Sequence, residues 1–208
     1  MLLNAEITVY MVRPTEKGGL VKKELRSSLR THMATLSPAV IQERSRAAAA
    51  RLFAEPEYQQ AEILMIYLSN WHEADTTSIV LQAWKDRKRV LAPQVGWETS
   101  RMIPVEISNL DTDIAETQYG IREPARGAPL PVGLIDLVIV PGLGFDGEGN
   151  RLGRGRGFYD RFLSRKGFRG VSCAFALEDQ FVESLPAREH DVRMNMLVTD
   201  QQVRRFHR

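Results

Sequence analysis

Hydrophobic residues recur every four positions near the start of the chain. They are Val21, Leu25, Leu29 and Met33. This spacing places the apolar side chains on one face of a helix. A second, alanine-rich helix is predicted to start at Ser37-Pro38, because serine caps helices and proline fits their first turn. That helix should extend to about Ala54, and Pro56 should end it.

Short apolar runs follow along the rest of the chain. They cover residues 61–69, 89–95, 102–107, 134–140, 171–177 and 196–199. Runs of this length between polar loops are typical of buried strands in parallel sheets. Helices are predicted between them: Asp75 can cap one that contains Ile79, Val80 and Trp84, and residues 158–165 have an amphipathic helical pattern.

The alternation of strands and helices predicts an α/β fold. We expect one three-layer α/β/α domain with a mostly parallel, mixed sheet, Rossmann-like and with helices on both faces. Residues 108–132 are predicted as turns only, and the basic tail after residue 199 has no predicted element. The domain should cover residues 20–208, and residues 1–19 should form a flexible extension ahead of the first helix.

Composition and charge exclude several classes of protein. Of the 208 residues, 43% are apolar and 26% charged, as in ordinary globular domains. A net charge of +2 does not indicate a nucleic-acid-binding protein, and no apolar run is long enough to span a membrane. Cys173, the single cysteine, excludes an internal disulfide, suits a reducing compartment and should be a buried apolar residue. We therefore expect a cytoplasmic protein without a secretion signal.

Glycine and arginine are concentrated between an apolar strand and the helix that follows it. Residues 142–157 contain seven of the fifteen glycines, together with Arg151, Arg154 and Arg156. Glycine lets a ligand approach bare backbone, so that successive N–H groups can converge on an anion. A helix start adds partial positive charge, and guanidinium groups match phosphate oxygens. The segment from Gly142 to Asp160 is therefore predicted to bind the phosphates of a nucleotide.

Two well-known phosphate motifs do not describe this segment. Residues 142–147 satisfy G-x-G-x-x-G, but in dinucleotide sites the glycines open a helix directly and an acidic residue follows about twenty positions later, at the end of the next strand. Neither condition holds here, and no Gly-Lys-Ser or Gly-Lys-Thr of a Walker A loop occurs. A solvated arginine-glycine loop that binds RNA is the remaining alternative. Such tracts repeat in a polar context, whereas this single copy lies between an apolar strand and a helix.

The run PGLGFDGEGNRLGRGRGFYD at 141–160 resembles the signature of the 5-formyltetrahydrofolate cyclo-ligases, also called 5,10-methenyltetrahydrofolate synthetases. Three further pieces occur in the family's order: KKELR at 22–26, LSNWHEADT at 68–76 and HD at 190–191. YGIREP at 119–124 resembles another turn of the family. The resemblance covers roughly residues 20 to 200.

This resemblance implies an ATP- and Mg²⁺-dependent enzyme. ATP would phosphorylate the formyl oxygen of 5-formyltetrahydrofolate, and N10 would then close the methenyl ring with release of phosphate. The chemistry agrees with the phosphate-binding prediction, because phosphoryl transfer depends on positioning and positive charge more than on a protein nucleophile. The partner would be a folate with or without a polyglutamate tail. No membrane or nucleic-acid partner is expected, and we expect a monomer.

The resemblance also implies which residues contact ATP. They are Lys22, Lys23, Glu24, Leu25, Arg26, Arg151, Leu152, Gly153, Arg154, Gly155, Arg156, Gly157, Phe158 and Tyr159. Lys22 and Arg26 lie four apart, so both project from one face of a helix and can clamp phosphates. Among the ATP residues, we expect Lys22, Arg151 and Arg154 to act in catalysis.

Metal and folate positions follow from the same resemblance. Asp160 and Asp191 match the family's magnesium carboxylates, which suits a cation that takes one or two carboxylates with phosphate oxygens and water. The folate positions are Leu68, Glu73, Tyr119 and Phe158.

Alternatives stay open for several of these residues. KKELR alone is typical of a solvated helix face, and Asp160 alone of a first-turn carboxylate. Phe158 stands where the family often has tyrosine, and Met194-Asn195 follows the HD pair where an apolar residue and an aspartate are expected. A non-catalytic relative that binds folate or RNA, or another ATP-dependent ligase or kinase, would keep the same scaffold.

Overall fold

The computed structural model describes residues 18–117 and 120–206. Most of the predicted N-terminal extension lies outside these ranges, and so does Tyr119. Gly18 and Gly19, which the prediction placed in the extension, are the first residues of a helix. Within the described ranges, no helix is long and apolar enough to cross a membrane.

The α-helices of this part of the chain are α1 (Gly18–Thr35), α2 (Pro38–Ala54), α3 (Pro56–Gln60), α4 (Thr77–Lys85) and α5 (Phe158–Leu163). The start of α2 confirms the prediction, because Ser37 Oγ accepts the N–H of Val40 at 3.3 Å. Pro56 follows the end of α2 as expected, yet it also opens α3, since its fixed φ suits a first helical turn. Asp75 accepts the N–H of Thr77 at 3.0 Å at the start of α4.

Seven strands form the main sheet in the order β11-β10-β9-β6-β1-β2-β3. They are β1 (Ile63–Ile66), β2 (Arg89–Gly96), β3 (Arg101–Ile107), β6 (Leu137–Val140), β9 (Val171–Phe175), β10 (Met196–Val198) and β11 (Val203–Arg205). Neighbouring strands from β10 to β2 pair in parallel, and the two edge strands pair antiparallel. The predicted mostly parallel, mixed sheet is confirmed.

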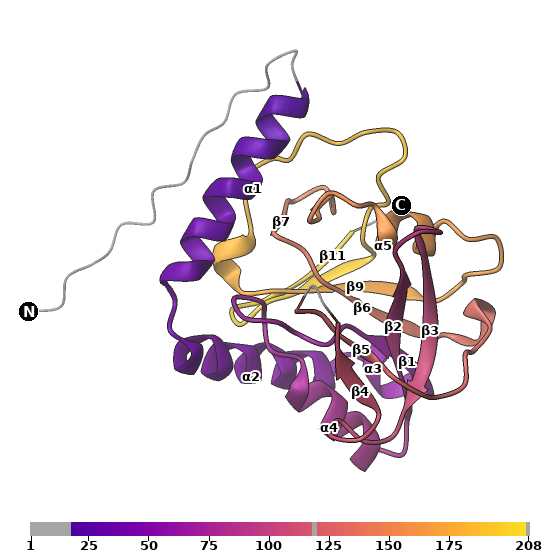
Figure 1. Ribbon diagram of the computed structural model, residues 1–208. Helices are drawn as coiled ribbons and strands as arrows, with labels where there is room; N and C mark the ends of the chain where they lie inside the picture. Colours follow the sequence, from indigo (N-terminus) through magenta and orange to yellow (C-terminus); the bar gives the residue numbers. More distant parts are fainter. Residues whose placement is uncertain (1–17, 118–119, 207–208) are drawn as a thin grey trace, which may run out of the picture.

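Helices cover both faces of this sheet (Figure 1). Leu64 and Ile66 of β1 pack in one cluster with α2 and α4, whereas Met65 packs in the other cluster with Phe162 of α5. This alternation follows from the two-residue period of a strand. Each fully buried aliphatic or aromatic side chain contributes about 1.5–3 kcal/mol, so the two clusters hold the three layers together. Cys173 is fully buried in the first cluster, as predicted.

Some short strands were not predicted. β4 (Ile114–Glu116) and β5 (Arg122–Pro124) pair antiparallel, so the prediction of turns alone over 108–132 is wrong. β7 (Gly144–Phe145) and β8 (Arg151–Leu152) form a second small hairpin within the glycine-rich segment. β11 forms in the tail. These strands have two or three residues each, which is too short for an alternating pattern to be recognised.

Candidate active site

A cavity of about 690 Å³ opens at the carboxyl ends of the central strands. Tyr67 and Leu68 line it directly after β1, and Pro141 and Gly142 line it directly after β6. Open α/β sheets commonly bind ligands at this edge. Segments far apart in the sequence complete the lining: α1, the β2–β3 hairpin, β5, residues 151–160 and the loop before β10.

Arg151 is the most buried cation of the glycine-rich segment, with a side chain only 5% exposed. Its guanidinium group donates to Asp160 Oδ2 at 3.0 Å and to the carbonyl of Pro141 at 3.3 Å. Its Nε is buried and has no hydrogen-bond partner within the described ranges. A buried cation with a spare donor beside an open cavity is suited to an anionic ligand.

Glycine conformation keeps this loop close to the cavity. Gly155 and Gly157 have φ of +109° and +66°, in the left-handed region that side-chain-bearing residues rarely adopt. Gly157 then leads directly into α5. Residues 151–160 all line the cavity, so the backbone of the segment faces the same space as Arg151 and Asp160.

The first half of the glycine-rich segment has a different role. Residues 143–150 do not line the cavity, although the prediction extended the phosphate site over the whole segment. They form the β7–β8 hairpin, which the buried carboxylate of Asp146 stabilises by accepting the N–H groups of Glu148, Asn150 and Leu185. The predicted phosphate segment is therefore too long at its start, because glycine density alone does not separate a tight turn from a ligand loop.

Two side chains of α1 reach the cavity on one helical face, as their spacing predicts. Lys22 Nζ donates to Asp191 Oδ2 at 2.7 Å, and Arg26 Nε donates to the Gly153 carbonyl at 2.9 Å. Burial lowers the pKa of Arg26, and the nearby charge of Arg30 lowers it further. The helix thus contributes two cations that face the loop from the opposite wall.

The three residues between them do not line the cavity. Lys23 and Glu24 are exposed to solvent, and Leu25 packs against the small apolar cluster of Leu29 and Leu152. Their side chains point away from the cavity because a helix presents only positions three or four apart on one face. The positions of these three side chains give no support to the predicted ATP contacts.

Asp160 and Asp191 face the same cavity from different segments. Asp160 Oδ1 accepts the N–H of Val192 at 3.3 Å, which ties the two carboxylates to one stretch of backbone. Burial acts to raise the pKa of Asp191, but the hydrogen bonds from Lys22 and from the Arg188 N–H outweigh it and lower that pKa.

The described residues contain no group of three or more metal-binding side chains. Two partly buried carboxylates, paired with Lys22 and Arg151, nevertheless suit Mg²⁺, which takes few protein ligands and fills its shell with phosphate oxygens and water. Asp160 and Asp191 are therefore the residues that could hold this ion.

Glu73 connects the loop after β1 with the glycine-rich segment. Its Oε1 accepts from the Arg154 guanidinium at 2.6 Å, and its Oε2 accepts the Asn70 N–H at 2.9 Å. Leu68, from the same loop, is buried beside it in the cavity wall. The predicted folate residues Leu68 and Glu73 and the predicted ATP residue Arg154 thus lie together in one cavity.

An aromatic wall forms where the β2–β3 hairpin meets α5. The rings of Trp97 and Phe158 lie edge to face with centroids 5.5 Å apart, and the Arg156 guanidinium lies 5.7 Å from the Trp97 ring centroid. The hydroxyl of Tyr159 is buried without a hydrogen-bond partner in the part of the chain that the structure describes. Burial raises the pKa of this phenol. Aromatic rings beside arginine suit a flat, heterocyclic ligand.

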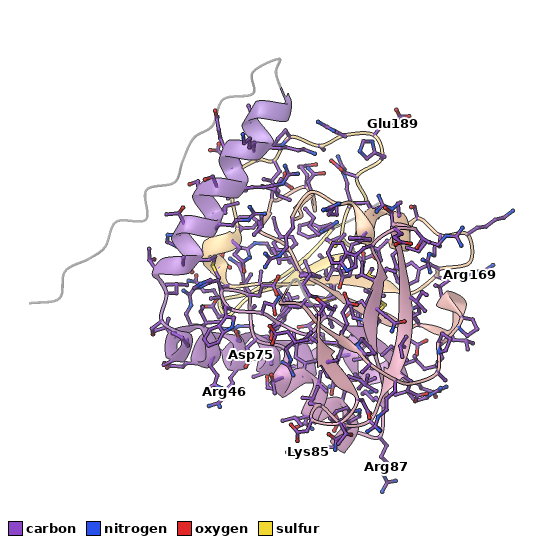
Figure 2. The ribbon with its side chains drawn as sticks, in the orientation of Figure 1. Arg46, Asp75, Lys85, Arg87, Arg169 and Glu189 are labelled. Atoms are coloured by element: carbon purple, nitrogen blue, oxygen red, sulfur yellow. The ribbon has the colours of Figure 1, made fainter. Side chains whose placement is uncertain are left out.

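Several cavity-lining residues were not predicted. They are Asn70, Pro93, Val95, Trp97, Met102, Ile121, Arg122, Glu123 and Arg188. His190, to which the sequence assigned no role, also lines the cavity, whereas Glu189 beside it lies at the outer edge of the loop (Figure 2). Most of these residues come from the β2–β3 hairpin or from the region predicted as turns. Only the long-range pairing of β2 with β3 and the position of β5 bring them to the site.

Comparison with known proteins identifies the relatives of this arrangement. The model of the 5-formyltetrahydrofolate cyclo-ligase family matches residues 19–200. The chain belongs to this family. The mouse 5-formyltetrahydrofolate cyclo-ligase is 30% identical over 185 residues, covering 84% of this chain and 91% of the relative. The Escherichia coli K12 relative of the same name is also 30% identical over 185 residues, with coverages of 84% and 98%.

A solved structure of the family has the same fold. The Aquifex aeolicus 5,10-methenyltetrahydrofolate synthetase aligns with a TM-score of 0.79 and 29% identity, over 90% of this chain and 94% of that chain. The cyclo-ligase family is a family of ligases in folate one-carbon metabolism, so the protein is an enzyme of this type. The resemblance seen in the sequence is thereby confirmed at the level of family and fold.

Proposed function

We propose that the protein uses ATP and Mg²⁺ to cyclise 5-formyltetrahydrofolate to 5,10-methenyltetrahydrofolate, with release of ADP and phosphate. The observation that carries this proposal is that one cavity is lined by Lys22 and Arg26 of α1, by Arg151 of the glycine-rich loop, and by Leu68 and Glu73 of the loop after β1. A phosphate donor and a folate bound there would lie side by side.

The reaction needs activation of a poor electrophile. The formyl oxygen attacks the γ-phosphorus of ATP, the bond to the bridging oxygen breaks, and ADP leaves. N10 then attacks the formyl carbon and loses its proton, the carbon–oxygen bond breaks, and phosphate leaves as the methenyl bridge forms. Negative charge develops on the bridging oxygen that leaves with ADP, and Arg151 and Lys22 would stabilise the charge of the transferring phosphoryl group and of this oxygen.

Internal ion pairs balance the charges of two cations in the cavity. Lys22 pairs with Asp191, and Arg151 pairs with Asp160. Phosphate oxygens would replace the carboxylates as partners of these cations, which releases the carboxylates for Mg²⁺. Mg²⁺ held by Asp160 and Asp191 would supply charge neutralisation for the triphosphate.

The ion pair between Glu73 and Arg154 connects the two substrate sites. When the Arg154 side chain turns to a phosphate, Glu73 Oε1 becomes free to accept a hydrogen bond from the folate ring. ATP is therefore expected to improve folate binding.

Product formation tests this proposal directly. Purified protein with ATP, Mg²⁺ and 5-formyltetrahydrofolate should yield the methenyl product, seen by its near-ultraviolet absorbance, and one ADP should form per product. Omission of ATP should abolish the signal. Folded protein that binds ATP but forms no methenyl product would contradict the proposal, and ADP release with other acceptors alone would favour a different ligase or kinase.

A further inference from the structure

Glu123 of β5 is a buried carboxyl with one unused oxygen. Only 7% of the residue is exposed, although glutamate is almost never buried without a partner. Its Oε2 accepts the Val95 N–H at 3.2 Å, and its Oε1 is buried without a hydrogen-bond partner in the described ranges. Burial raises the pKa of this carboxyl, whereas the Val95 N–H acts weakly in the other direction. No cation of the described chain forms an ion pair with it within 4.0 Å.

A buried polar atom without a partner is destabilising, so its retention calls for an explanation. The hydrogen bond to Val95 does not explain why a carboxylate is present, because the carbonyl oxygen of a glutamine would accept the Val95 N–H equally well. Glu123 also lines the cavity, where its neighbours in the wall include Val95 and Met102 of the β2–β3 hairpin. Because Glu123 lines the cavity, a ligand bound there is a candidate partner for the unused oxygen.

The chemistry of that ligand follows from the surroundings of Glu123. Apolar and aromatic side chains make up much of this wall, namely Pro93, Val95, Trp97, Met102 and Phe158, and its cations are Arg122 and Arg156, the latter over the Trp97 ring. Walls of this kind bind flat rings, and a single polar group fixes the ring's orientation. The cations Lys22, Arg26 and Arg151 come instead from α1 and the glycine-rich loop, where a triphosphate would bind. An acceptor oxygen in an apolar wall suits a ring that presents N–H groups.

We propose that Oε1 of Glu123 accepts a hydrogen bond from a ring N–H of the reduced pterin of 5-formyltetrahydrofolate, which makes Glu123 a further residue that selects this substrate. The inference rests on the proposed cyclo-ligase function. Reduced pterins carry several N–H donors on one ring system, whereas adenine carries a single amino donor beside acceptor nitrogens. Glu123 would act alongside Glu73, which reaches the cavity from the loop after β1.

Glu123→Gln is the informative substitution, because it retains size and shape. Glutamine has one carbonyl oxygen, and the Val95 N–H requires it. The amide NH₂ would then occupy the position of Oε1 and meet the pterin N–H, donor against donor. We expect the Kd for 5-formyltetrahydrofolate, measured by calorimetry without ATP, to rise at least tenfold while the KM for ATP stays within twofold. The exposed Glu116 of β4 provides a matched control as Glu116→Gln, for which both constants should match the unmodified protein.

Binding of 5-formyltetrahydropterin, which lacks the aminobenzoylglutamate tail, tests whether Glu123 contacts the pterin ring itself. Glu123→Gln should raise the Kd of this fragment by the same factor as the Kd of the full substrate. An unchanged Kd for both ligands, a loss confined to the full folate, or a rise in the ATP KM in place of the folate Kd would each overturn the inference. Failure of the proposed function is distinguishable from these outcomes, because the unmodified protein would then form no methenyl product.

Discussion

Charged side chains at the loop end of the cavity (Lys22, Arg26, Arg151, Asp160 and Asp191) are paired with one another or with a backbone carbonyl. At the hairpin end (Pro93, Val95, Trp97, Met102 and Glu123), the wall is apolar, and its carboxyl has one oxygen without a partner in the described chain. Under the proposed function, the cations of the loop end would exchange their carboxylate partners for the oxygens of a bound phosphate. The hairpin end offers a shaped surface with one fixed polar contact.

This difference suggests a division of work within one cavity. Highly charged ligands need cations that are held in place before binding, and ion pairs to carboxylates provide this. Flat ring systems need area and a small number of hydrogen bonds. Arg154 and Glu73 lie between the two ends and connect them.

Removal of Arg151 should have the largest effect. Arg151→Ala deletes a buried cation and leaves Asp160 without its partner. Hydrogen bonds to charged groups are worth about 1.5–3 kcal/mol each. Loss of two such bonds from Arg151 to the phosphates of ATP should therefore lower kcat/KM by roughly 100-fold or more. Steady-state kinetics measures this, and circular dichroism checks the fold. Arg46→Ala is the control, since Arg46 is an exposed residue of α2 that extends away from the ribbon (Figure 2) and does not line the cavity. Unchanged ATP affinity in Arg151→Ala would argue against a phosphate role.

Disruption of the connection between the ends should be less severe. Glu73→Gln keeps an acceptor for the Asn70 N–H but removes the charge that pairs with Arg154. We expect the KM for 5-formyltetrahydrofolate to rise about tenfold, as for one charge-assisted hydrogen bond. The increase in folate affinity that ATP causes should also become smaller. Calorimetric titration of folate with and without a non-hydrolysable ATP analogue measures both effects, and an undiminished ATP effect would speak against the connection.

Truncation of an aromatic side chain at the hairpin end should have a smaller effect on activity still. Trp97→Ala removes the ring that lies edge to face with Phe158. Aromatic pairs are worth about 0.5–1.5 kcal/mol beyond their buried area, so the folate KM should rise roughly 3- to 10-fold with little change in the ATP KM. Trp97→Phe should recover most of the loss. A selective rise in the ATP KM would instead assign this wall to the nucleotide.

The smallest expected effect concerns stability and pH. Because the folded-state pKa of Glu123 is raised above the ordinary value of 4.5, its contribution to stability is present below that pH and is lost as the pH rises through the folded pKa. Glutamine mimics the protonated form. The thermal midpoint of Glu123→Gln relative to the unmodified protein should therefore rise as the pH increases above about 4.5. A constant difference across this range would show that burial does not perturb the carboxyl.

The sequence predicted the loop end better than the hairpin end, for physical reasons. Lys22, Arg26 and Arg151 belong to local motifs whose spacing or composition predicts phosphate contacts, and the structure brings all three to one cavity. Trp97 lies in a segment without such a pattern, and Glu123 lies in YGIREP, which resembles a turn of the family but indicated no site role for this residue. Their position depends on the pairing of β2 with β3 and on the short β5, which are long-range features.

Within the fold, the strands of the parallel core were predictable because burial on both faces makes them continuously apolar. The hairpins β4–β5 and β7–β8 were not predictable, since strands of two or three residues are too short to show the alternation of apolar and polar side chains. Glycine content was misleading over residues 143–150, where it serves the hairpin around Asp146 and not the cavity.

The most direct test of the central claim follows the formyl oxygen of the substrate. If ATP phosphorylates that oxygen in this cavity, 5-formyltetrahydrofolate labelled there with a heavy oxygen isotope should transfer the label quantitatively to inorganic phosphate, as measured by mass spectrometry. Label in water, with unlabelled phosphate, would mean that ATP is hydrolysed apart from ring closure and would contradict the account.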